Sequence, residues 1–399
     1  MMGKVIMSGI VPKLTKPRAK LPAGYTELVY IQSSGAQYIN TEYNPNQDTR
    51  VVMDVAVMSS QTTEGHFASC TGGGYYYTLY VTAGLVCGTR YGSQALQSVG
   101  SALAAGERYT IDKNKNVTYA RGSSVTHTEE TFQMAYPLTL FCRNAAGTKA
   151  RYVSAKLYSC QIYENGALVR EFIPAKRDSD GVAGLYDLVN KVFYASASST
   201  DFIAGPMTEL SAGYTKLAYI ESTGPQYFNL CFKANQNTRV IVDVDITAAS
   251  AERAIFGART AGQNTAFCVW TAPNNNGYQS DYGNQMATPV GSNSTGRHLI
   301  DRNKNVLTVD GTVVHTHTES TFQTAYDMYL LQVNNKGSIL TGYPFAGKTY
   351  FCQVYDNETL IRDLVPCISD ADGVGLYDLV NGVFYGNAGT GIFIGSEVA

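Results

Sequence analysis

The chain carries the same seven residues, GLYDLVN, twice, at Gly184–Asn190 and at Gly375–Asn381. Five further pairs of similar segments follow the same order, and all six pairs are offset by 189 to 192 residues. These five pairs are Ala23–Thr26 and Ala212–Thr215, Asn46–Val55 and Asn235–Val244, Ile111–Val117 and Ile300–Val306, His127–Gln133 and His317–Gln323, and Cys160–Tyr163 and Cys352–Tyr355. Such a period is far longer than the units of solenoid proteins, so each copy is expected to hold its own core. The chain is a tandem duplication.

The duplication divides the 399 residues into two repeats, each of an ordinary domain size. We predict one domain at residues 21–205 and a second at residues 206–399. Residues 1–20 precede the first repeat and have no copy in the second.

Apolar and polar residues alternate along many short stretches. In RVVMDVAV (Arg50–Val57) one set of alternate side chains is apolar, and RVIVDVDI (Arg239–Ile246) repeats the pattern. Half-buried strands produce this alternation, and Asp310–Gly311 is a typical hairpin turn between two of them. No long segment has helical periodicity. The sequence therefore predicts all-β domains built as antiparallel sandwiches, and the identity of the two GLYDLVN segments is ascribed to packing.

Long stretches of the chain resemble a known family. Residues Gly24–Val55, Ala155–Tyr194 and His298–Val314 are similar to concanavalin A-like lectin/glucanase jelly rolls. In particular they resemble the LamG-like domains in structural proteins of phages and prophages of gut bacteria. MGKVIMSGIVPKL (Met2–Leu14) resembles the leader segment of minor structural proteins from such phages. The resemblance implies two tandem jelly rolls, association with a virion and a carbohydrate ligand.

The first twenty residues contain five lysines and arginines and no acidic residue, whereas the remaining chain holds 25 basic and 32 acidic residues. The arm also offers apolar anchors, and its two prolines favour an extended segment. Docking onto other virion proteins and a disordered tail are both open interpretations. The residues expected to dock are Lys4, Val5, Ile6, Ile10, Val11 and Lys13.

The cysteine pattern argues against a disulfide framework. Of eight cysteines only Cys160 and Cys352 occupy matching positions in the repeats, although a structural bridge would have been copied with its domain. We expect free buried thiols made in a reducing bacterial cytoplasm. The start of the chain reads poorly as a signal peptide, and no stretch is apolar enough to span a membrane. The net charge of −2 gives no reason to expect nucleic acid.

Catalytic and metal sites have weak support. The glucanases of this superfold carry an E-x-D-x-x-E strand, which is missing here, so no enzymatic activity is expected. His315 and His317 would share a strand face, but only the second has a counterpart, His127, so zinc is disfavoured. The turns DSDG and DADG offer carboxylates to calcium, although they also suit plain turns. Their acidic residues are Asp178, Asp180, Asp370 and Asp372.

The repeats differ most between residues 59–107 and 248–297, and variable loops on a shared scaffold commonly carry binding specificity. Aromatic rings stack on sugar C–H groups, and Asn, Asp and Arg pair with hydroxyls. The alternative is that these aromatics pack into the core, since the sequence does not say which strand face is buried. The candidate ligand-binding residues are Tyr76, Tyr80, Arg90, Tyr91, Trp270, Asn275, Tyr278, Asp281 and Tyr282.

Three functions remain open. The first is a non-enzymatic virion surface protein, on a capsid or a tail, that is anchored by its arm and contacts glycans of the host surface. The second is a purely structural decoration or tail accessory protein that binds only virion proteins. The third and least favoured is a glycan-cleaving enzyme. The sequence leaves open whether copies of the chain associate with one another.

Overall fold

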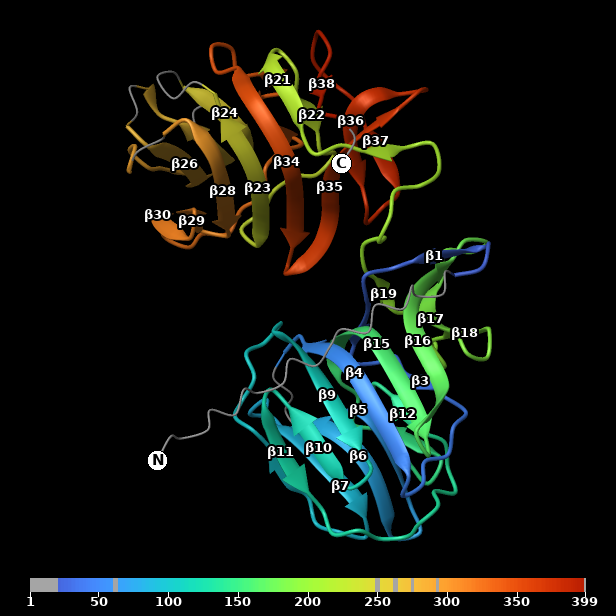
Figure 1. Cartoon of the computed structure of the whole chain (residues 1–399). Helices are drawn as coiled ribbons and strands as arrows, with labels where there is room; N and C mark the ends of the chain where they lie inside the picture. Colours follow the sequence, from blue (N-terminus) through green and yellow to red (C-terminus); the bar gives the residue numbers. More distant parts are fainter. Residues whose placement is uncertain are drawn as a thin grey trace, which may run out of the picture. The chain divides into compact units, whose positions relative to one another are not determined.

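The computed structural model describes residues 21–59, 64–247, 252–260, 265–273, 276–291 and 294–397. The chain divides between Ala204 and Gly205 into two compact units (Figure 1), named sandwich 1 and sandwich 2. The described residues contain no α-helix, and hence no helix that could cross a membrane. The six arm residues expected to dock on a particle lie outside these described residues.

Sandwich 1 consists of an 11-stranded and an 8-stranded sheet. Across the larger sheet lie β11 (Ser123–Thr126), β10 (Val117–Ala120), β9 (Arg108–Asn114), β4 (Thr49–Val57), β15 (Ser154–Glu164), β16 (Ala167–Arg177), β17 (Ala183–Asp187) and β18 (Val192–Ala195), with β1 (Tyr25–Glu27), β2 (Ile31–Ser34) and β19 (Ile203–Ala204) at its margins. Across the smaller sheet lie β14 (Thr148–Ala150), β13 (Arg143–Ala145), β5 (Gly65–Gly72), β6 (Tyr75–Val81), β7 (Cys87–Gly92) and β8 (Gln97–Val99), with β12 (Thr139–Leu140) paired to β5 and β3 (Ile39–Asn40) paired to β12.

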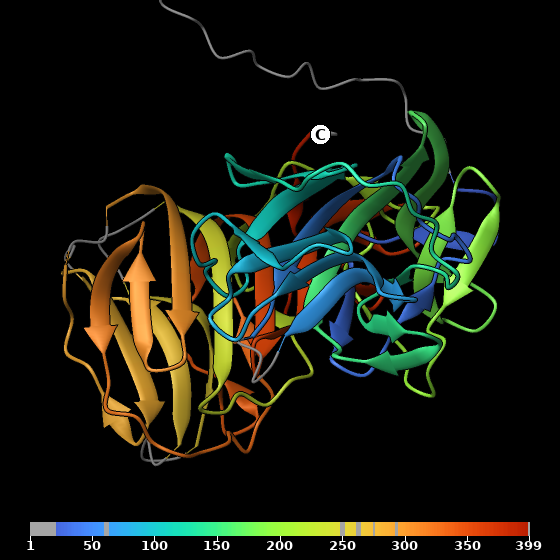
Figure 2. The ribbon, with the colours of Figure 1, turned by 90° about the horizontal axis from the view of Figure 1, so that it is seen from below.

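Sandwich 2 repeats this strand order, and Figure 2 shows its strands in two layers. Its larger sheet contains β30 (Thr312–Thr316), β29 (Val306–Val309), β28 (Gly296–Asn303), β23 (Thr238–Ile246), β34 (Phe345–Asp356), β35 (Thr359–Ser369), β36 (Gly373–Asp378) and β37 (Val383–Tyr385), with β20 (Thr215–Lys216), β21 (Ile220–Gly224) and β38 (Ile394–Gly395). Its smaller sheet contains β22 (Phe228–Asn229), β31 (Tyr329–Leu330), β24 (Arg253–Arg259), β25 (Ala266–Thr271), β26 (Tyr278–Gly283) and β27 (Gln285–Met286), with β32 (Val333–Asn335) and β33 (Ser338–Ile339). The all-β tandem jelly-roll fold expected from the sequence is confirmed.

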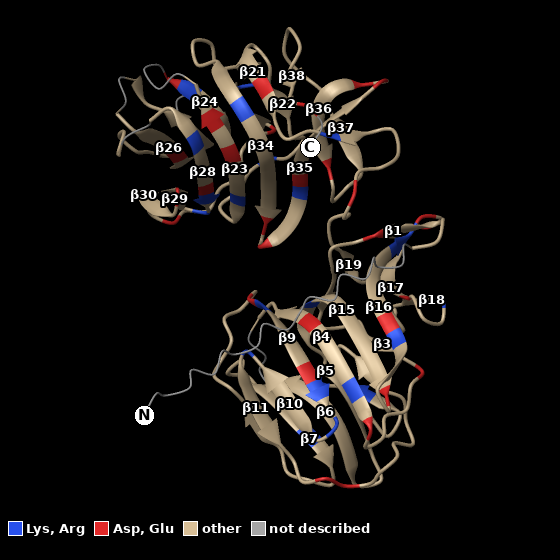
Figure 3. Ribbon diagram, viewed as in Figure 1, with Lys and Arg blue, Asp and Glu red and all other residues tan. Residues whose placement is uncertain are grey.

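The predicted alternation gives each larger sheet one apolar and one charged face. The apolar residues of β4 and β23 are buried against the smaller sheet. Their charged residues alternate with the apolar ones and form ion pairs with residues of β9 and β28. In Figure 3 the charged positions of these neighbouring strands lie next to one another. These pairs are duplicated: Arg50–Asp112 and Arg239–Asp301 at 2.6 Å, Arg108–Asp54 at 2.7 Å and Arg297–Asp243 at 2.8 Å.

The GLYDLVN segments owe their identity to a buried carboxylate and a close backbone approach. Asp187 is fully buried, and its oxygens accept hydrogen bonds from the backbone of Glu171 and Val189 and from Asn190 Nδ2 at 2.6–3.0 Å. Asp378 makes the equivalent contacts in sandwich 2. A Cβ on Gly184 would lie 2.3 Å from the carbonyl oxygen of Tyr194. Packing and hydrogen bonding therefore account for the motif, as expected.

All eight cysteines are free thiols, as the sequence indicates, and all of them except Cys231 are buried. Burial raises the pKa of the Cys87 and Cys142 thiols to about 11, which keeps them protonated and unreactive at neutral pH.

Candidate functional site

The smaller sheets contain matching strands even though their sequences have diverged. In sandwich 1, Tyr77 lies opposite Tyr91 and Tyr80 lies opposite Gly88. In sandwich 2, the same ladder places Phe267 opposite Tyr282 and Trp270 opposite Gln279. Strands β6 and β7 of sandwich 1 and strands β25 and β26 of sandwich 2 are therefore the same ladder with two sets of side chains.

Three of the candidate aromatic residues belong to the core. Tyr91, Tyr278 and Tyr282 face the larger sheet and are at most 2% exposed. The hydroxyl of Tyr91 donates to the carbonyl oxygen of Gln47 at 3.0 Å, and that of Tyr282 donates to the carbonyl oxygen of Gln236 at 3.2 Å. The expectation of exposed rings is wrong for these three tyrosines, because their side chains pack into the core, which is the alternative given above.

Tyr80, Trp270 and Asp281 lie on the outer face of the smaller sheets and are also buried, at 1%, 5% and 1% exposed. Trp270 packs in an apolar cluster, and its indole Nε1 donates to Gln279 Oε1 at 2.8 Å. An exposed stacking platform is therefore wrong for Tyr80 and Trp270. Burial raises the pKa of the Asp281 carboxyl to about 6, and neither of its oxygens has a hydrogen-bond partner among the described residues.

Tyr76 and Arg90 are the candidates that keep accessible surface. Both are half-buried, and the Arg90 guanidinium carbon lies 3.4 Å from the centre of the Tyr76 ring. Such stacking fixes the guanidinium while leaving its donors available. Ligand contact by these two residues stays a prediction. Asn275 lies outside the described residues.

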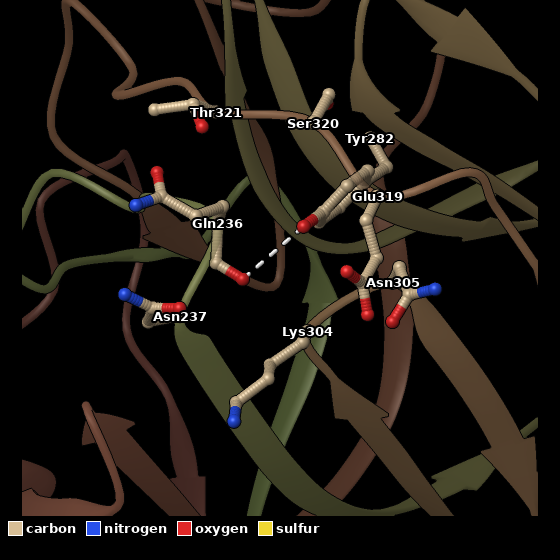
Figure 4. Close-up of a pocket in the computed structure, with 8 residues that line it drawn as sticks. All are labelled: Gln236, Asn237, Tyr282, Lys304, Asn305, Glu319, Ser320 and Thr321. Atoms are coloured by element: carbon tan, nitrogen blue, oxygen red, sulfur yellow. Dashed lines mark hydrogen bonds between the residues drawn. The ribbon is translucent and has the colours of Figure 1, made fainter.

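A polar pocket of about 370 Å³ opens at one edge of sandwich 2 (Figure 4), and it is named the edge pocket. Three duplicated segments converge there: NQNTR before and into β23, NKN between β28 and β29, and HTESTFQ after β30. The lining residues are Gln236, Asn237, Tyr282, Lys304, Asn305, Glu319, Ser320 and Thr321.

Some lining groups make hydrogen bonds within the protein, and others face the open space of the pocket. Gln236 Oε1 accepts from the backbone nitrogen of Phe322 at 3.1 Å, and Asn305 Nδ2 donates to the carbonyl oxygen of His317 at 2.7 Å. The hydroxyl oxygen of Ser320 is buried without a hydrogen-bond partner among the described residues. In Figure 4, Asn237, Lys304 and Glu319 surround the same space. The Lys304 ammonium also donates to Glu358 Oε1 at 3.2 Å. The pocket thus offers amide and carboxylate groups, and an ammonium that is already paired, to a polar ligand.

The corresponding edge of sandwich 1 carries two acidic side chains that the edge pocket lacks. Asp48 replaces Asn237, and its carboxylate pairs with Lys115 at 2.7 Å. Glu130 replaces Ser320, and its carboxylate accepts from the backbone nitrogen and the hydroxyl of Ser93 at 2.7 and 3.1 Å. The two edges therefore differ in charge, since sandwich 1 carries two paired carboxylates where sandwich 2 has an amide and a hydroxyl.

A buried cation lies in the core of each sandwich. Lys113 is fully buried, and its Nζ donates to Thr89 Oγ1 at 2.8 Å. Arg302 takes its place in sandwich 2 and donates to Ser280 Oγ at 3.2 Å. Burial lowers the pKa of Lys113 to about 7 and that of Arg302 to about 10.

The candidate calcium turns are stabilised by protein contacts. Asp178 accepts from the Thr26 hydroxyl at 2.7 Å, Asp180 pairs with Arg177 at 2.6 Å, and Asp372 accepts from the Tyr214 hydroxyl at 2.7 Å. Asp370 is exposed. These contacts favour the turn interpretation.

His315 and His317 lie within hydrogen-bonding distance of protein oxygens rather than beside other metal-ligating side chains. His315 Nε2 lies 2.9 Å from the carbonyl oxygen of Tyr278, and His317 Nε2 lies 2.9 Å from Ser280 Oγ. Within the described part of the chain, no group of three or more His, Cys, Asp or Glu side chains is placed to hold a metal ion.

The sequence interpretation missed the edge pocket because its residues lie in the conserved-looking repeats, which were treated as framework. Most of their amides and hydroxyls do stabilise the local backbone, as the hydrogen bonds of Asn235, Gln236 and Asn305 show, so the segments carried no separate signal of a pocket. A polar pocket of this size suits a small ligand rich in hydrogen-bonding groups.

Neither a protein-family model nor a curated protein sequence matches the chain. Among solved structures, the mouse laminin α1 domains LG4-5 align over 95% of both chains at 12% identity and a TM-score of 0.30. A mutant NanB sialidase from Streptococcus pneumoniae aligns over 92% of this chain and 75% of its own at 10% identity, with a TM-score of 0.24. The binding domain of botulinum neurotoxin DC, in complex with SialylT, aligns over 87% and 77% at 8% identity and 0.24. The fold assignment rests on the strand order of the chain itself.

Proposed function

We propose that this protein is a non-enzymatic surface protein of a phage particle, on a capsid or a tail, which binds glycans in the edge pocket of sandwich 2. Residues 1–20 attach it to other virion proteins. The virion role is supported by the resemblance of Met2–Leu14 and of the repeats to phage structural proteins.

The single observation that carries glycan binding is the difference between the two edges. The pocket lined by Asn237, Lys304 and Ser320 is open and polar, whereas its copy carries the paired carboxylates of Asp48 and Glu130. Its volume lies in the range of small-ligand sites, and its groups can pair with several sugar hydroxyls. Because aromatic rings at this edge are buried, recognition would come from hydrogen bonds rather than stacking.

The test is glycan-array binding by the full chain and by variants that exchange the two edges. Ser320→Glu places the sandwich 1 side chain in the pocket, and Asn237→Asp offers Lys304 the ion pair that Lys115 makes. Each is expected to abolish binding. The matched controls Glu130→Ser and Asp48→Asn alter sandwich 1 only and should leave binding intact.

Two results would contradict the proposal. Glycan binding that survives both pocket substitutions would remove the edge pocket as the site. A protein that binds no glycan and yet co-sediments with particles would support the second function, a purely structural virion component.

A further inference from the structure

A second group of polar side chains lies on the outer face of the smaller sheet of sandwich 1. His66 comes from β5, Tyr76 and Tyr80 from β6, Arg90 from β7 and Arg143 from β13. Two residues just outside strands complete the group, Glu64 before β5 and Arg151 after β14. These seven residues are named the cationic face.

The floor of the cationic face contains buried polar atoms without partners. His66 is 3% exposed, and neither ring nitrogen makes a hydrogen bond within the described part of the chain. The same holds for the hydroxyls of Tyr80, Ser69 and Thr78 and for Arg143 Nε. The rings of His66 and Tyr80 lie 5.3 Å apart. Buried polar atoms nearly always have partners, so a cluster of unpaired ones indicates a bound group.

The rim is partly exposed and positively charged. Glu64 lies 3.5 Å from His66 Nε2 and 3.3 Å from the Arg151 guanidinium, and it is the one carboxylate in the group. Arg90, Arg143 and Arg151 outnumber it. Burial and then the Arg151 charge lower the pKa of Arg143, and burial with Arg143 and Arg151 lowers the pKa of His66 to about 3. The arginines therefore repel one another, and the single carboxylate of Glu64 offsets only part of their charge.

Sandwich 2 shows that the fold does not require these groups. The ladder places Ala254 where sandwich 1 has His66 and Trp270 where it has Tyr80, and Val333 takes the place of Arg143. With Cys268 and Leu340 these residues form an apolar cluster that needs no polar partner. The polar side chains of the cationic face are thus specific to sandwich 1.

We propose that the cationic face of sandwich 1 binds an anionic group, a carboxylate or a sulfate, through Arg143, Arg151 and His66. Both anions accept several hydrogen bonds and match the planar guanidinium donors. The bound anion would satisfy the buried donors and offset the excess of positive charge. The same chemistry occurs in free anions and in acidic sugars, and the site is separate from the edge pocket.

The experiment follows the histidine ring resonances of the full chain by NMR while sodium sulfate, acetate, glucuronate or glucose is added at constant ionic strength. Sulfate is expected to shift the His66 signal saturably and to raise its pKa, because an anion favours the protonated ring. Arg143→Val reproduces the residue of sandwich 2, and Arg151→Gln removes the charge but keeps a polar hydrogen-bonding side chain. Each should weaken sulfate binding about 10- to 100-fold.

The controls separate this site from the rest of the chain. Arg108→Gln removes a cation that pairs with Asp54 on the larger sheet and should leave sulfate binding unchanged. Ser320→Glu, which fills the edge pocket, should leave it unchanged too, so the two proposals fail independently. If glucuronate binds more tightly than acetate and glucose does not bind, the ligand is an acidic sugar. If acetate binds as tightly as glucuronate, the site takes free anions.

The proposal is overturned if no anion moves the His66 signal, or if both arginine variants bind sulfate as the unmodified chain does. In that case water alone would satisfy the buried donors.

Discussion

Replacing Lys113 by methionine tests whether the core of sandwich 1 holds an uncompensated lysine. The side chain is fully buried, its Nζ has Thr89 Oγ1 as hydrogen-bond acceptor at 2.8 Å, and none of the ion pairs of the described residues involves it. Burial lowers its pKa from 10.5 to about 7. Methionine keeps the apolar stem and removes the charge.

The magnitude follows from proton linkage. Between pH 7 and pH 10.5 the unfolded chain binds more protons at Lys113 than the folded chain, so the free energy of unfolding rises with pH in this window. The buried lysine lowers the free energy of unfolding of sandwich 1 by about 5 kcal/mol at pH 6 and by about 2 kcal/mol at pH 9. Since Thr89 also loses one hydrogen bond, of about 1 kcal/mol, Lys113→Met should stabilise sandwich 1 by about 4 kcal/mol at pH 6 and about 1 kcal/mol at pH 9.

Hydrogen exchange of the β4 and β9 amides in urea, on the full chain, measures the stability of sandwich 1. Trp270 is the one tryptophan of the sequence and lies in sandwich 2, so its fluorescence reports unfolding of that unit and should not change. A stabilisation that is the same at pH 6 and pH 9 would refute a lowered pKa for Lys113. No stabilisation at pH 6 would show that the charge is compensated.

Three further predictions concern packing and the arm. Trp270→Ala should destabilise sandwich 2 by about 3–5 kcal/mol, because the indole is 5% exposed, and calorimetry should show a lower melting temperature; unchanged melting would show an exposed ring. Gly184→Ala should cost about 1–3 kcal/mol, because its Cβ would overlap the Tyr194 carbonyl, whereas Gly84→Ala, with only Thr82 Oγ1 at 3.9 Å, should leave the urea midpoint unchanged. Deleting Met1–Lys20 should leave both sandwiches folded, by circular dichroism, and abolish co-sedimentation with particles; truncated protein that still co-sediments would disprove docking by the arm.

The fold could be predicted from the sequence because its signals are local or repeated. Alternation in Arg50–Val57 and Arg239–Ile246 reports a half-buried strand without knowledge of its partners. Repetition of GLYDLVN reports that each copy satisfies its own buried carboxylate, which the contacts of Asp187 and Asp378 bear out.

The candidate site was harder to predict because alternation separates two strand faces without saying which one is covered. In FCVW, Trp270 and Phe267 lie on opposite faces of β25, and both are buried, since an apolar cluster covers the outer face of this sheet. The edge pocket depends on residues near 236, 304 and 320, which only the strand order brings together. Pairing of distant strands is what local sequence patterns do not encode.

Under the proposed function, the exchange of Asn237 and Ser320 for Asp48 and Glu130 would also set the number of sugar sites in each chain. Two copies of a sugar-binding domain would ordinarily reinforce each other on a surface, since the second contact forms at a high effective concentration. If sugar binding is confined to the edge pocket of sandwich 2, as proposed, that gain is unavailable within one molecule. Avidity for a glycan-coated surface would then have to come from many chains displayed side by side, so adhesion would depend on how densely a particle carries them.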